Sequence, residues 1–403
     1  MKDRLERKII EIEKIIKLKY KDEKGIGLLM GLSGMALFEF YYSKYFNSEE
    51  NAEIGSDIII ECVNKINNGY SSSTFAHGIS GFGWALDHLE QENFITIDND
   101  KLLTECDQLL YNGMISFLKE GDYDLLNGGL GYAYYFLNRF RTTKSNKLKD
   151  KYKIYLFEFI KIIEDLAEED GENKLKWVSV LNRENNEIGY NLCLSHGMAS
   201  LIGMFTKLYE YEVFKPRVEK MLIKSINYIL DLRNDEKIAS CFFPSSILLN
   251  GKINNKIRVA WCYGDLGLGI RLLHASKALR DNELNTLSIT MLKHVASRTT
   301  FETNLVYDAG ICHGSFGNAQ IFNKVFMETG DSTFKDASAF WLNDGFDKAN
   351  HQDGYAGFKQ FKGDNRAWVA EHNLLFGIAG IGLTLIDQLS HSNHNWDECL
   401  MIS

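Results

Sequence analysis

Apolar residues recur at three- and four-residue steps along several long stretches of the chain, which is the pattern of amphipathic helices. Residues 101–120 and 149–168 are two examples. Between such stretches lie shorter segments that are apolar on nearly every side, such as GYAYYFL and GIGLTLI. A helix without a polar face is covered by protein all round. The pattern therefore predicts helical hairpins in which an outer helix covers a buried inner one.

Each apolar inner segment follows a short glycine motif, Gly-x-x-Gly, in which serine replaces the last glycine once. The first glycine of the motif recurs at intervals of 47 to 69 residues, at Gly31, Gly78, Gly128, Gly197, Gly264, Gly314 and Gly377. Glycine permits a positive φ and close packing of one turn against the next. A single hairpin cannot bury its inner helix, so neighbouring hairpins must stack. We predict an all-α fold, an α/α toroid of seven helical hairpins in one domain of residues 1–403; the alternative is an open helical solenoid.

Two intervals between the motifs are long and contain sequence patterns typical of β-strands. Residues 169–193 predict a hairpin around Arg183–Asn186, and residues 233–260 contain the dipeptide Asn250-Gly251, which is a strong hairpin-turn signal. We expect these two segments to form a small β-containing insertion on the toroid. Such an insertion is a candidate docking place for a peptide substrate or a partner.

Composition narrows the class of protein. The chain has 33 glycines but two prolines and is 45% hydrophobic, as expected for an ordered, mostly helical chain with a large core. A net charge of −9 gives no reason to expect nucleic acid as a partner. The sequence contains no apolar run of about 18 residues, so we expect no membrane span. Seven cysteines, an odd number without a secretion signal, predict reduced thiols and a cytoplasmic location.

Two of the cysteines occupy the same place in the repeat. Cys262 and Cys312 each lie two residues before the first glycine of a turn, and His313 follows Cys312. In a toroid of hairpins, equivalent turns gather at one end. Two thiolates and one imidazole suit Zn²⁺, and three protein ligands leave a fourth position open, as in catalytic zinc sites. We predict that these three residues bind zinc and that the other five cysteines are small apolar core residues.

The segments Trp261-Cys-Tyr-Gly-Asp265 and Cys312-His-Gly314, on seven glycine turns, resemble the lanthionine-forming cyclases, the LanC-type family. The likeness runs from Gly31 to Gly382. It implies an α/α toroid that binds one zinc ion and cyclises dehydrated precursor peptides by joining a cysteine thiol to dehydroalanine or dehydrobutyrine. It assigns the zinc ligands to Cys262, Cys312 and His313.

The resemblance also places four residues near the metal, namely Asp124, His196, Arg258 and Tyr263. Thiolate attack on a dehydro residue produces an enolate, which needs charge stabilisation and then a proton on its α-carbon. Arg258 suits the first task because it stays protonated. His196 is the candidate acid for the second task, or the base for the incoming thiol. Asp124 would orient His196 or Arg258, and Tyr263 would donate a hydrogen bond. Asp265 is interpreted as the cap of the helix that follows it.

Two alternatives fit the same residues. One is a LanC-like enzyme that adds glutathione to dehydrated residues, and the other is a non-catalytic, peptide-binding toroid whose metal is structural. The expected partners are a dehydrated precursor peptide and a separate dehydratase, with an exporter complex as a further candidate and as the only route to a membrane. We expect the protein to be a monomer.

Overall fold

The computed structural model describes residues 2–182, 185, 187–235, 241–255, 258–363, 365–390 and 394–403. The described chain is mostly helical. It forms two compact units, of which one comprises residues 1–110, 306–401 and 403 and the other residues 111–305 and 402. No helix among the described residues has the length and apolar character needed to cross a membrane.

Each predicted glycine turn leads directly into a largely buried helix. These inner helices are α2 (Leu32–Phe46), α4 (Ile79–Gln91), α7 (Gly129–Thr142), α9 (Met198–Tyr209), α11 (Asp265–Leu279), α14 (Ser315–Thr329) and α16 (Ile378–Leu389). The segments GYAYYFL and GIGLTLI lie in α7 and α16 and are buried throughout. The prediction of inner helices without a solvent face is therefore confirmed.

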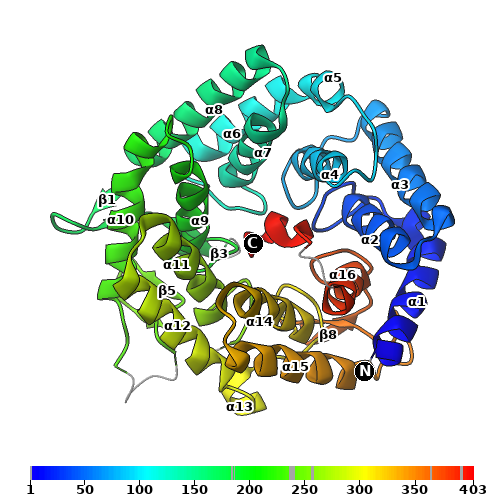
Figure 1. Cartoon of the computed structure of the whole chain (residues 1–403). Helices are drawn as coiled ribbons and strands as arrows, with labels where there is room; N and C mark the ends of the chain where they lie inside the picture. The colour runs from blue at the N-terminus through cyan, green and yellow to red at the C-terminus, as the bar shows by residue number, and fades with distance from the viewer. Residues whose placement is uncertain are drawn as a thin grey trace. The chain divides into compact units, whose positions relative to one another are not determined.

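Amphipathic outer helices cover the inner ones. They are α1 (Lys2–Lys19), α3 (Glu49–Asn67), α6 (Asp107–Lys119), α8 (Asn146–Asp165), α10 (Lys215–Asp231), α12 (Asn282–Ala296) and α15 (Ser332–Asp347). In the first unit α3 packs on α2, α15 on α14 and α1 on α16, and in the second unit α8 packs on α7, α10 on α9 and α12 on α11 (Figure 1). The last inner helix is thus covered by the first helix of the chain.

Shorter helices complete the helical structure of the described residues. They are η1 (Tyr20–Asp22), α5 (Asn99–Thr104), α13 (Phe301–Asn304) and η2 (Trp396–Leu400). The stretch 101–120, predicted as one helix, is divided between α5 and α6.

The glycine turns serve close packing more than an unusual backbone conformation. Among the first glycines of the motifs, Gly264 has a positive φ of 90°, whereas the other six are extended. Of the two properties that glycine permits in these turns, a positive φ is used at Gly264 alone among these seven glycines. The second glycine is needed for space, because a Cβ on Gly317 would lie 1.9 Å from the carbonyl oxygen of Ile311.

Neighbouring turns are joined by main-chain hydrogen bonds at one repeated position, two residues before the first glycine. In the first unit the N–H of Cys312 donates to the carbonyl of Leu375 at 2.9 Å, and the N–H of Leu375 donates to the carbonyl of Leu29 at 2.9 Å. In the second unit the N–H of Ser195 donates to the carbonyl of Cys262 at 3.4 Å. The backbones of both predicted cysteine ligands are therefore held by an adjacent turn.

Both strand-like segments contribute to one antiparallel sheet in the second unit. Its strands lie in the order β3 (Ser179–Asn182), β4 (Glu187–Asn191), β5 (Ser246–Leu248) and β6 (Ile253–Asn254). The predicted hairpins are β3–β4 and β5–β6. Residues 183, 184 and 186 of the first predicted turn, and 236–240 and 256–257 of the second segment, lie outside the described residues.

Two further strand pairs lie outside this sheet. β1 (Glu168–Glu169) pairs with β2 (Leu175–Lys176), and β7 (Gln360–Lys362) pairs with β8 (Ala367–Val369). The second of these hairpins follows α15 and has no counterpart in the strands predicted from the sequence.

Candidate functional site

Cys262, Cys312 and His313 form a group that could hold a metal ion. One ligand atom from each lies within 4.8 Å of the other two. Both cysteines are buried, and the histidine is partly exposed. Soft thiolates combined with one imidazole are a donor set that zinc favours. The residues present therefore fit the zinc ion that the family resemblance implies.

The turn that carries Cys262 is anchored by a buried carboxylate. Asp265 is 1% exposed and accepts the N–H groups of Phe242 at 2.8 Å and Phe243 at 3.1 Å. Burial raises the pKa of Asp265, although these two donors act in the opposite direction. The prediction that Asp265 caps α11 is wrong, because its carboxylate binds the main chain of the 233–260 segment instead.

The turn that carries His313 is anchored in a similar way. Nε2 of His313 lies 3.1 Å from Oδ2 of Asp308, and that oxygen also accepts the N–H of Phe361 in β7 at 2.9 Å. Oδ1 of Asp308 accepts the N–H of Gly310 at 3.2 Å. Burial alone would raise the pKa of this carboxyl group, but the donors outweigh it and lower the pKa. Asp308 is absent from the predicted site. Its position four residues before Cys312 is the one sequence feature that connects it with the metal-binding group.

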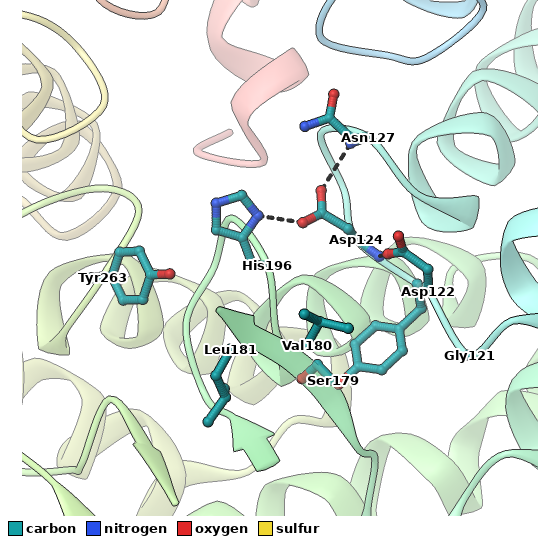
Figure 2. A pocket seen from close by; sticks show the side chains of 10 residues that line it. Gly121, Asp122, Asp124, Asn127, Ser179, Val180, Leu181, His196 and Tyr263 are labelled. Carbon is teal, nitrogen blue, oxygen red and sulfur yellow. Dashed lines mark hydrogen bonds and ion pairs between the residues drawn. The ribbon is translucent and has the colours of Figure 1, made fainter. Parts of the chain in front are cut away.

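His196 and Asp124 form a pair in the second unit. Oδ1 of Asp124 accepts the N–H groups of Leu126 at 2.7 Å and Asn127 at 2.9 Å, which fixes the carboxylate in the third glycine turn. Its other oxygen, Oδ2, is bonded to Nδ1 of His196 (Figure 2). Of the two partners that the sequence left open for Asp124, the structure shows this bond to His196.

The pair lies at a pocket of about 190 Å³. Tyr263, the neighbour of Cys262, contributes another wall, and its ring centroid is 6.1 Å from that of His196. Ser179, Val180 and Leu181 of β3 line the same pocket (Figure 2). One predicted insertion therefore borders three of the predicted site residues, namely Asp124, His196 and Tyr263.

Arg258 reaches this region through its main chain. It is partly buried, and its carbonyl oxygen would lie 2.6 Å from a Cβ placed on Gly264. The next residue, Val259, donates its N–H to the carbonyl of Asn304 at 2.9 Å. Arg258 is not among the described residues that line the pocket of His196. The structure thus places the backbone of Arg258 against the Cys262 turn without adding its side chain to that pocket.

Known protein families and solved structures were compared with this chain. A family model described as "Lanthionine synthetase C-like protein" matches residues 22–401. Among solved structures, nisin cyclase aligns with a TM-score of 0.72 at 18% identity, over 99% of this chain and 98% of that chain.

Two epimerases align less well. A sugar epimerase from a ruminal bacterium has a TM-score of 0.45 at 10% identity, over 92% of this chain and 89% of its own. Cellobiose 2-epimerase from Bacillus thermoamylovorans has a TM-score of 0.42 at 14% identity, over 91% and 88%. Likenesses at this level support no inference about the present chain. The match to the family model, which extends over nearly all residues, shows that the chain belongs to the lanthionine synthetase C-like family, and the nisin cyclase likeness shows the α/α toroid fold.

Proposed function

We propose that the protein is a zinc-dependent cyclase, which adds cysteine thiols of a dehydrated precursor peptide to dehydroalanine or dehydrobutyrine to form lanthionine and methyllanthionine rings. The observation that carries this proposal is the group of Cys262, Cys312 and His313 in a chain of this family. Zinc bound there would lower the pKa of a substrate thiol and supply the nucleophilic thiolate. Two cysteine ligands favour such sulfur chemistry because their negative charges offset the charge of the ion.

His196 is proposed to transfer a proton during the reaction. When the new carbon–sulfur bond forms at the β-carbon of the dehydro residue, the electron pair of the double bond moves onto the carbonyl oxygen as an enolate. A proton must then reach the α-carbon. Asp124 binds Nδ1 of His196 and so fixes the orientation of the ring, which supports Nε2 as the nitrogen that transfers the proton in this proposal. His196 serves as this acid, or as the base that takes the proton of the incoming thiol.

Arg258 and Tyr263 are proposed to stabilise the enolate. A guanidinium offers a positive charge and several N–H donors, which suits it to a developing oxyanion. Tyr263 lines the pocket of His196 and can donate a hydrogen bond there. Ser179, Val180 and Leu181 line the same pocket, which supports a role for the β-sheet insertion in contacting the peptide.

The substrate must come from an enzyme that removes water from serine and threonine side chains. We therefore propose a dehydratase as the partner upstream of this protein, and an exporter complex as the partner downstream. The proposal places the protein in the cytoplasm as a monomer, in contact with a membrane only through that complex.

A thiol-alkylation assay tests the reaction. Ring closure leaves the mass of the peptide unchanged, so the peptide is treated with N-ethylmaleimide after incubation and then analysed by mass spectrometry. We expect protein with zinc to yield peptide of unchanged mass that resists alkylation, faster than peptide alone or protein treated with a chelator. A repeat of the assay with glutathione separates the alternatives. A glutathione adduct would indicate a transferase, and bound but unaltered peptide would indicate a non-catalytic toroid.

A further inference from the structure

We propose that Asp308 is a positioning residue for the metal site, because it holds Nε2 of His313 and so leaves Nδ1 as the nitrogen that binds zinc. This inference rests on the proposed zinc site and extends it by naming the residue that orients the histidine ligand. Metal-bound histidines generally donate their second ring N–H to a carboxylate or carbonyl oxygen, which fixes the tautomer and makes the ligating nitrogen more basic.

The carboxylate of Asp308 is held in place independently of the histidine. Its two oxygens accept the N–H groups of Gly310 and Phe361 at 3.2 and 2.9 Å, and the side chain is 2% exposed. Nε2 of His313 meets Oδ2 at 3.1 Å as a third donor. An ionised carboxylate only accepts hydrogen bonds, so the proton of a neutral imidazole at this place belongs on Nε2. The lone pair is then on Nδ1, where a metal can bind.

Other contacts hold the two residues in the same turn. The carbonyl oxygen of Asp308 accepts the N–H of Ser315, the first residue of α14, at 3.1 Å and its hydroxyl at 3.2 Å. The ring of Phe376 lies 5.7 Å from the ring of His313, centroid to centroid. The imidazole therefore has a carboxylate at one nitrogen and an aromatic neighbour, which together restrict its rotation.

The hairpin of β7 and β8 helps to hold the carboxylate of Asp308 in place. Phe361 of β7 supplies one of the donors to Asp308, and its ring is stacked on Tyr307 at 4.6 Å between centroids. The cross-strand partner of Phe361 is Trp368 of β8. This hairpin thus supports the carboxylate that orients the ligand, although no residue of its own belongs to the metal-binding group.

The substitution Asp308→Asn tests the inference through zinc affinity. An asparagine offers one acceptor oxygen where the carboxylate accepts three donors, so His313 or the main chain loses a partner. We expect the Kd for zinc, measured by competition with a chromophoric chelator, to rise about 10- to 100-fold, with one zinc still bound at saturation. An unchanged Kd in folded Asp308→Asn protein would overturn the inference.

The matched control is Asp387→Asn. Asp387 also forms a buried pair with a histidine, since its Oδ1 lies 2.6 Å from Nδ1 of His394, but His394 is not in the metal-binding group. We expect this control to lower thermal stability and to leave the Kd for zinc unchanged. A similar rise in Kd in both variants would show that the effect is a general loss of stability, and would overturn the positioning role.

A measurement on the wild-type protein decides the matter even if Asp308→Asn does not fold. In protein labelled with ¹⁵N-histidine and loaded with zinc, long-range ¹H–¹⁵N spectra identify which nitrogen carries the proton, and His313→Gln assigns the signal. We expect His313 to be protonated at Nε2; a proton on Nδ1 would overturn the inference.

Neither readout depends on the cyclisation reaction. If wild-type protein binds zinc but closes no rings, the proposed function is wrong. The role of Asp308 is then still decided by the Kd for zinc and by the protonated nitrogen of His313. Wild-type protein that binds no zinc would overturn both proposals.

Discussion

At the scale of single residues, the neighbours of a buried cysteine decide what its thiol does, and burial alone keeps the thiol neutral. It raises the pKa of Cys62 to about 12 and that of Cys241 to about 11, because a buried thiolate loses its hydration. Such thiols stay neutral near pH 7 and pack as apolar side chains. Cys262 and Cys312 are also buried, but they are grouped with His313. A metal ion bound by this group would stabilise their thiolate forms.

This difference predicts that Cys312→Ala removes zinc from the folded protein. Two ligands do not retain the ion as three do, so we expect the zinc content measured by elemental analysis to fall from about one per chain to near zero, and ring formation with it. The matched control is Cys62→Ala, which truncates a buried thiol outside the metal-binding group and should retain zinc. Undiminished zinc in folded Cys312→Ala protein would contradict the assignment of the ligands.

The pair of His196 and Asp124 predicts a variant that keeps its zinc but loses activity. His196→Ala should keep its zinc and lose about 10²- to 10⁴-fold in the rate of ring formation, because the proton donor is removed and the ligands are not. The control is His77→Ala, since His77 occupies the same turn position in the second repeat but interacts through its carbonyl oxygen, which accepts from Gly27 and Tyr70. Rates that remain at the wild-type level in His196→Ala would remove this residue from the mechanism.

The sequence could indicate part of this site. Alignment of the repeats brings Cys262 and Cys312 to one position, because main-chain hydrogen bonds give equivalent residues equivalent places. Asp308 could not be found in this way, since its partner Phe361 lies on a strand outside the repeat. The partners of Asp265 are also hidden from sequence analysis, because a helix cap is a local interaction, whereas this carboxylate accepts the N–H groups of Phe242 and Phe243 in another segment.

At the scale of elements, the three helices α1, α2 and α3 meet around a buried acid. Glu39 of α2 is fully buried, and its Oε2 accepts the amide of Asn51 of α3 at 2.7 Å. Its other oxygen has no hydrogen-bond partner among the described residues. Burial raises the pKa of Glu39 to about 8, Asn51 lowers it, and the nearby charges of Glu13, Lys17 and Glu50 act with smaller effect.

This acid predicts a stability that falls as pH rises. Between about pH 4.5 and 8 the folded state holds a proton on Glu39 that the unfolded state has released, so the free energy of unfolding should decline by up to about 1.4 kcal/mol per pH unit. Glu39→Gln should remove this part of the slope in urea denaturation at several pH values. The control Glu50→Gln changes an exposed neighbour and should keep the slope. Parallel curves for wild type and Glu39→Gln would contradict the prediction.

The helices of the repeat were predictable because period and glycine spacing both signal them. The hairpin of β7 and β8 was not, because strands of three residues carry too short a pattern. Its described contacts are tertiary, such as the bond from Phe361 to Asp308 and the stacking on Tyr307. Elements of this kind depend on partners far away in the chain, which periodicity does not reveal.

At the scale of the whole molecule, the two ends of the chain are both built into the core of the first unit. α1 buries Leu5, Ile9, Ile12 and Ile16 and packs against α16. Near the other end, Trp396 is fully buried and donates its indole N–H to Asp387 of α16 at 3.0 Å. α16 is therefore covered by the segment that begins the chain and bonded to the one that ends it.

Substitutions in α1 should show this contribution. Ile12→Ala removes a fully buried side chain, and we expect it to lower the free energy of unfolding by about 2–5 kcal/mol. Leu18→Ala, in the same helix, changes a residue that is 77% exposed and should alter it by less than about 0.5 kcal/mol. Chemical denaturation measures both. Equal midpoints for the two variants would show that α1 does not contribute to the cooperative core.

The packing of α1 on α16 has a consequence for synthesis on the ribosome. α1 emerges from the ribosome well before its partner α16, so the apolar side chains that α16 covers stay exposed until α16 has been made. A nascent or prematurely terminated chain then offers a hydrophobic helix to chaperones and to other copies. Synthesis of α16, rather than emergence of any earlier hairpin, is the event that allows this part of the core to form.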